Sequence, residues 1–76
     1  MKKIENSECL SDFGEWIRRE RERRDLSQAE VAKMVGIHQT YYGKIELAKR
    51  VVDLVAAMNI CKALGLDLSD FIKTHM

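Results

Sequence analysis

The most constraining feature of the sequence is a helix start and a helix stop that lie close together. Ser27 and Glu30 form a capping-box pattern, in which the serine hydroxyl accepts the N–H of Glu30 and the glutamate carboxylate accepts the N–H of Ser27. Gly36 can end this helix, because glycine adopts the left-handed backbone conformation at little cost. A further helix is expected over about residues 38–46. The pattern therefore predicts two short helices joined by a tight turn.

The remainder of the chain is also predicted to be helical. Its 76 residues include no proline and only four glycines, a composition that favours helices with short turns over strands. Additional helices are expected over about residues 11–24 and 53–64, with a short one after Asp67. We therefore expect an all-α, compact five-helix domain over residues 11–76, preceded by a flexible tail over residues 1–10.

The spacing of apolar residues predicts which helix faces are buried. The first helix is expected to bury Phe13, Trp16 and Ile17, and the rest of its surface is a solvated face of Arg and Glu. Tyr42 is expected to lie partly in the core. The inward-facing positions expected on the last two helices are Leu54, Met58, Cys61, Leu64, Leu68, Phe71 and Ile72.

The composition and the available motifs exclude several classes of protein. Hydrophobic residues make up 46% and charged residues 33%, as in a soluble globular domain, and the net charge of +1 does not by itself indicate nucleic acid. No apolar run approaches the roughly 20 residues of a membrane span, so a cytoplasmic protein is expected. The spacings of Cys9, His38, Cys61 and His75 match no zinc pattern. No catalytic arrangement is evident, so we expect neither an enzyme nor a metal or other cofactor.

The stretch from Leu26 to Arg50 carries the functional information. The run LSQAEVAKMVGIHQTYYGKIELAKR resembles the phage-repressor-like helix-turn-helix family, of the Cro/CI or xenobiotic-response-element type. The run FGEWIRRERERR is similar to the first helix of that family, and MNICKALGLDLSDFI to its fourth and fifth. The resemblance covers roughly residues 12–72. It implies sequence-specific binding of double-stranded DNA, as a small transcriptional regulator whose second helix of the motif lies in the major groove.

The resemblance also implies which side chains read the bases. Gln39 and Thr40 open the recognition helix, and Lys44 lies one turn further along the same face. A glutamine amide can pair with N6 and N7 of adenine, and a threonine offers a hydroxyl or a methyl group to thymine. We therefore expect DNA base contacts from Gln39, Thr40 and Lys44.

Other matched positions are expected to contact phosphates or to hold the helices together. Arg21 and Glu46 occupy positions that often form a salt bridge in this family. Gly43 departs from the family pattern, since a glycine inside a helix costs about 1 kcal/mol relative to alanine. The expected phosphate contacts are Gln28, His38, Tyr41, Lys49 and Arg50.

A group of apolar residues follows the motif and predicts a homodimer. Val51, Val52, Val55 and Ala56 form an apolar patch near the start of the fourth helix, where the resembled fold tends to be exposed. Helix-turn-helix domains commonly bind paired half-sites as two-fold dimers. We therefore expect an isologous dimer through residues 51–58. The alternative is that the fourth helix lies deeper in this protein.

One rival function comes from a different class. A protein-interaction module, such as an antitoxin or adaptor with a helix-turn-helix fold, would account for the low net charge and the apolar patch. Because little sequence follows the fifth helix, no small-molecule effector is expected, and regulation would depend on protein concentration, a partner protein or DNA geometry.

Overall fold

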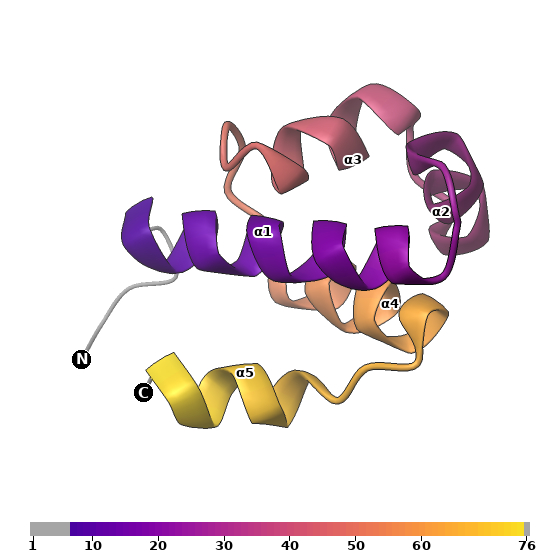
Figure 1. Ribbon diagram of the computed structural model, residues 1–76. Helices are drawn as coiled ribbons and strands as arrows, with labels where there is room; N and C mark the ends of the chain where they lie inside the picture. Colours follow the sequence, from indigo (N-terminus) through magenta and orange to yellow (C-terminus); the bar gives the residue numbers. More distant parts are fainter. Residues whose placement is uncertain (1–6, 76) are drawn as a thin grey trace.

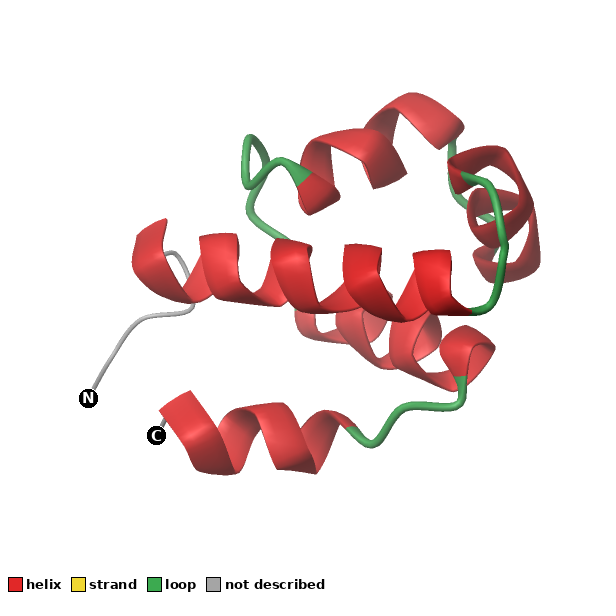
Figure 2. Cartoon of the chain, viewed as in Figure 1, coloured by secondary structure: helices red, strands yellow, loops and turns green. Residues whose placement is uncertain are grey.

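The computed structural model describes residues 7–75, which form helices and connecting loops without any strand (Figures 1 and 2). This arrangement confirms the predicted all-α, five-helix fold. Helix α1 lies across the molecule, with α3 on one side of it and α5 on the other (Figure 1). In chain order the helices are α1 (Ser7–Arg23), α2 (Gln28–Val35), α3 (Gln39–Glu46), α4 (Leu54–Leu64) and α5 (Leu68–His75).

Helix α1 begins earlier than the sequence indicated. It starts at Ser7, whereas the expected start was residue 11. Leu10 packs against the core three residues before Phe13, so the apolar stripe of the helix extends one turn further than expected. The remaining part of the predicted tail, residues 1–6, lies outside the described residues.

The capping box predicted at Ser27 and the helix end predicted at Gly36 are both confirmed by the structure. The N–H of Glu30 donates to Ser27 Oγ over 3.0 Å, and the N–H of Ser27 donates to Glu30 Oε1 over 2.8 Å. Gly36 ends α2 in the left-handed conformation, with φ of 83°. Asp53 caps α4 by accepting the N–H of Ala56, and Gly65 ends that helix. These local signals fix where α2 and α4 begin and end.

The core lies between α1 and the three helices that follow. Phe13 and Ile17 are buried as predicted, whereas Tyr42 is fully buried and not only partly so. The buried apolar residues are Phe13, Ile17, Val31, Ala32, Tyr42, Ile45, Val52, Ala56, Ala57, Ile60, Cys61 and Leu64.

The buried face of α4 differs from the expected one. Leu54 and Met58 were expected to face inward, but they are 55% and 53% exposed. The helix instead buries Ala56, Ala57 and Ile60, together with the two residues that were correctly predicted nearer its end. Because the first turns of α4 are apolar on every side, hydrophobic spacing could not identify the inner face. Small alanines occupy two of these buried positions.

Helices α1 and α3 approach closely at Gly14. A β-carbon on Gly14 would lie 2.5 Å from the carbonyl oxygen of Glu46 and 2.6 Å from that of Ile45. Backbone atoms cannot move aside as a flexible side chain can, so only glycine fits here. This contact sets the position of the C-terminal end of α3 against α1.

Helix α5 packs against α1 through aromatic rings. The Phe71 ring stacks on Trp16 with centroids 5.3 Å apart and meets the Phe13 ring edge-on at the same separation. The His75 ring stacks on Phe71 at 4.0 Å, and its Nε2 lies 2.9 Å from Asp12 Oδ2. These contacts hold α5 along α1, although α5 itself contributes no fully buried residue.

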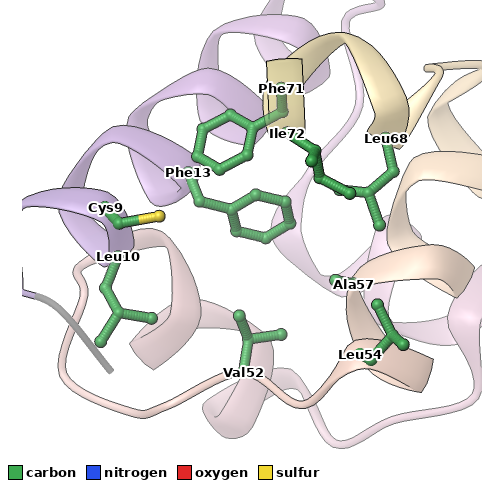
Figure 3. Close-up of a pocket in the computed structure, with 9 residues that line it drawn as sticks. All are labelled: Cys9, Leu10, Phe13, Val52, Leu54, Ala57, Leu68, Phe71 and Ile72. Carbon is green, nitrogen blue, oxygen red and sulfur yellow. The ribbon is translucent and has the colours of Figure 1, made fainter. Parts of the chain in front are cut away.

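A wholly apolar cavity of about 100 Å³ lies where α5, α4 and the N-terminal part of α1 meet. Figure 3 shows Phe13 at the centre of its lining, with Leu10 on one side and Leu68 on the other. Ile72 also lines the cavity, but it is 40% exposed, which corrects the expectation that it faces inward. The packing beneath α5 is therefore incomplete.

Candidate nucleic-acid interface

The turn between α2 and α3 is short and closed by two backbone hydrogen bonds. The N–H groups of Gly36 and Ile37 both donate to the carbonyl oxygen of Ala32, over 2.8 and 3.0 Å. His38 then caps α3, since its Nδ1 accepts the N–H of Thr40 over 3.1 Å. The imidazole therefore caps the helix at a position where a serine or threonine hydroxyl is common. An accepting Nδ1 places the proton of the neutral ring on Nε2, which remains a donor.

Helix α3 is amphipathic, with a polar outer face and a buried inner face. Gln39, Thr40 and Lys44 are all exposed, and Thr40 and Lys44 are one helical turn apart. On the opposite face, Tyr42 and Ile45 are buried in the core. The three side chains predicted to read bases therefore share an accessible surface on a helix whose other face is fixed.

An ion pair connects the ends of α1 and α3. Arg21 Nε donates to Glu46 Oε2 over 2.7 Å, and Arg21 Nη2 donates to Glu46 Oε1 over 3.1 Å. The third nitrogen of the same guanidinium, Nη1, donates to the Leu26 carbonyl over 2.8 Å. Gln28 Nε2 donates to Glu46 Oε1 over 2.9 Å. The cluster thus ties α1, α2 and α3 together around one carboxylate.

Burial and hydrogen bonding act on this carboxylate in opposite directions. The Glu46 side chain is only 1% exposed, which disfavours its ionised form. The hydrogen bonds from Arg21 and Gln28, together with the neighbouring Tyr42 hydroxyl, outweigh that effect and hold the pKa of Glu46 below its ordinary value. Its carboxylate in turn raises the pKa of Arg21. Glu46 is therefore a paired, ionised group, which is the condition under which a buried charge is tolerated.

Tyr42 occupies the position where the resembled family usually has an aliphatic residue. Its ring is fully buried, and its hydroxyl meets no hydrogen-bond partner within residues 7–75. Burial and the neighbouring Glu46 carboxylate both raise the pKa of Tyr42 above its ordinary value, so the phenol stays neutral. The ring fills the space between α3 and the core, and its hydroxyl lies beside the Glu46 carboxylate without forming a hydrogen bond of good geometry.

The residues after α3 follow a tight left-handed turn. Ala48 has φ of 59°, and the N–H of Lys49 donates to the carbonyl of Lys44 over 2.8 Å. The Arg50 guanidinium lies 5.2 Å from the centroid of the Tyr41 ring, a cation–π arrangement. Of the predicted phosphate contacts, the structure thus brings Tyr41 and Arg50 together and leaves the Lys49 side chain exposed. Gln28 is held in the Glu46 cluster.

The apolar patch on α4 includes different residues from those predicted. Val52 is 4% and Ala56 is 8% exposed, so both belong to the core of the monomer and cannot form a contact surface. Asp53 starts the helix in a register that turns Ala56 inward. Val51 and Val55 are exposed as predicted. Leu54 and Met58, which were predicted to be buried, join them on the surface.

Other side chains do not suggest a further chemical site. Burial raises the pKa of the Cys61 thiol to about 11, so it remains protonated at neutral pH. Within residues 7–75 we find no cluster of histidine, cysteine and acidic side chains placed to hold a metal ion. The described helices also include none that is long and apolar enough to cross a membrane.

The arrangement of a capped short helix, a tight turn and a second helix with a polar outer face has a counterpart among known families. The helix-turn-helix family matches residues 17–71 of this chain. The chain belongs to this helix-turn-helix family. The matched range begins within α1 and ends within α5, so it includes the Arg21–Glu46 ion pair as well as the two helices of the motif.

Two relatives support the same assignment. The control protein C.MunI from Mycoplasma sp is 41% identical over 59 residues, which span 76% of this chain and 80% of that protein. The crystal structure of the restriction-modification controller protein C.AhdI from Aeromonas hydrophila has a TM-score of 0.77 and 31% identity, covering 82% of this chain and 94% of the other. Both are named as control or controller proteins. The chain is a DNA-binding transcriptional regulator.

Proposed function

We propose that the chain controls a restriction-modification system by binding duplex DNA sequence-specifically as a homodimer. The observation that carries the proposal is the exposure of Gln39, Thr40 and Lys44 on a helix whose opposite face is buried in the core. Base reading requires side chains held in register with the groove, and a buried inner face supplies that rigidity. The likeness to two controller proteins supports the choice of biological context.

The residues around the recognition helix are suited to hold the DNA backbone. His38 presents an Nε2 donor at the start of α3, while Lys49 and Arg50 follow its end. The Arg50 guanidinium lies over the Tyr41 ring, which places its charge next to the recognition helix in this proposal. Phosphate contacts of this kind set the register of the protein on DNA and make binding salt-dependent.

The dimer surface that we propose is the exposed apolar face formed by Val51, Leu54, Val55 and Met58. All four are more than half exposed, and three of them lie on α4. Contiguous exposed apolar surface of this kind commonly marks an interface. A two-fold dimer would place two copies of α3 about 34 Å apart, one turn of duplex DNA.

Fluorescence anisotropy with labelled duplexes tests the function. Binding should weaken steeply as salt is raised, and duplexes selected from a random pool should bind at least about tenfold tighter than random duplexes. Lys44→Ala should weaken binding to a selected duplex, whereas Lys73→Ala, which removes the same charge from α5, should not. The proposal is wrong if the wild-type chain binds no duplex at low salt, or binds all duplexes equally.

A further inference from the structure

Gly43 lies inside the recognition helix, where its lack of a side chain has a specific structural reason. A β-carbon at this position would lie 3.2 Å from Oε1 of Gln28 and within 4 Å of the other two atoms of that amide group. The carboxamide of Gln28 therefore rests on the backbone of α3, in the space that any other residue would fill with its own side chain.

A second restraint acts on the same carboxamide. Gln28 Nε2 donates to Glu46 Oε1 over 2.9 Å, and Glu46 is itself held by two hydrogen bonds from Arg21. Gly43 and Glu46 are three residues apart on α3, so they lie on the same side of the helix. The Gln28 amide is thus fixed by contact at one residue and by a charge-assisted hydrogen bond at the other.

We propose that Gly43 is a positioning residue for DNA binding, because it seats the Gln28 amide so that Gln28 can clamp a backbone phosphate. An amide nitrogen carries two hydrogens, and Glu46 accepts only one in the observed contact. The second hydrogen is available for a phosphate oxygen, and the amide is held before the DNA arrives. This proposal rests on the proposed function, since it gives Gly43 the role of positioning Gln28, an expected phosphate contact, within the same DNA interface.

A double-mutant cycle tests the coupling of the two residues. Gly43→Ala should weaken binding to a selected duplex by roughly three- to tenfold, because the displaced amide loses a preorganised hydrogen bond. In a Gln28→Ala background, the same substitution should leave affinity unchanged. Gly43→Ala should fold at least as well as the wild type, since alanine is favoured over glycine inside a helix. Equal losses in the two backgrounds would overturn the proposal.

A measurement on the DNA-free protein separates this proposal from the function on which it rests. Nuclear Overhauser contacts between the Gln28 side-chain amide protons and the α-protons of Gly43 should be present in the wild-type protein. Their absence would overturn the seating of Gln28 even in a protein that binds DNA. If these contacts are present but the wild type binds no duplex, the proposed function fails, and the phosphate role of Gln28 fails with it.

Discussion

Gly14 on α1 faces the carbonyl oxygen of Glu46 on α3 so closely that no side chain fits between the two helices. Gly14→Ala should therefore lower the free energy of unfolding by about 2 kcal/mol, despite the higher helix propensity of alanine. Chemical denaturation followed by circular dichroism would measure the change. Gly43→Ala is the matched control, because the group that it meets is a flexible side chain and not backbone. Equal stability of Gly14→Ala and wild type would contradict the close approach.

Tyr42 carries a buried hydroxyl that lies beside the Glu46 carboxylate but forms no hydrogen bond of good geometry within residues 7–75. Tyr42→Phe keeps the ring that fills the core and removes the unsatisfied polar atom. We expect the variant to be as stable as the wild type or more stable by about 1 kcal/mol. Thermal unfolding would show this as an unchanged or raised Tm. Tyr41→Phe, at a position that is only partly buried, provides the comparison, and a marked loss of stability in Tyr42→Phe would show that the hydroxyl is bonded.

Glu46 makes the stability of the fold depend on acidity. Burial alone would raise its pKa, but the hydrogen bonds of Arg21 and Gln28 and the neighbouring Tyr42 hydroxyl hold the folded-state pKa below the ordinary value of 4.5. The stabilisation is therefore complete above the unfolded-state pKa and is lost as the pH falls through the lower folded-state pKa. Glu46→Gln should be less stable than the wild type at neutral pH, and the difference should shrink at about pH 3.

Urea titrations of both proteins across this pH range would measure the difference. The pKa values of Glu20, Glu30 and Asp67 are also lowered, but these residues are present in both proteins, so their contributions cancel. A stability difference that stays constant from neutral to acidic pH would show that the carboxylate of Glu46 is not the group responsible.

The exposed face of α4 leads to a prediction about assembly. Val55 is 66% exposed, and Val55→Lys should convert a dimer into a monomer in sedimentation experiments by placing two charges in a two-fold interface. Met34→Lys is the control, because Met34 is a similarly exposed apolar residue on α2. If Val55→Lys remains dimeric, the dimer uses another surface. DNA affinity should fall together with dimerisation, since each monomer alone makes few base contacts.

Features that depend on local chemistry could be predicted from the sequence. The bonds at Ser27 and the left-handed turns at Gly36 and Gly65 involve neighbouring residues, so short patterns identify them. The burial of α4 could not be predicted in this way. Its first turns contain apolar residues in succession, and only the contacts with α1 and α2 determine that Ala56 faces inward while Val55 faces outward.

The candidate site also combines features that the sequence could predict with features that depend on tertiary contacts. The exposed positions of Gln39 and Lys44 follow from the resemblance to a known motif. Gly14 and Gly43 each contact another helix, and such contacts between helices cannot be derived from local sequence. From the sequence alone, a glycine inside a helix is only unusual. A glycine within an otherwise helical run is the signal that could have pointed to both close approaches.

The loosely packed end of the molecule has a consequence for its dynamics. Helix α5 contributes no fully buried residue, and the cavity beneath it removes contacts that would otherwise hold it. The recognition helix, by contrast, is fixed to α1 and α2 through buried groups. We therefore expect the backbone amides of α5 to exchange with solvent much faster than those of α3, so that the C-terminal helix opens while the DNA-reading surface keeps its shape.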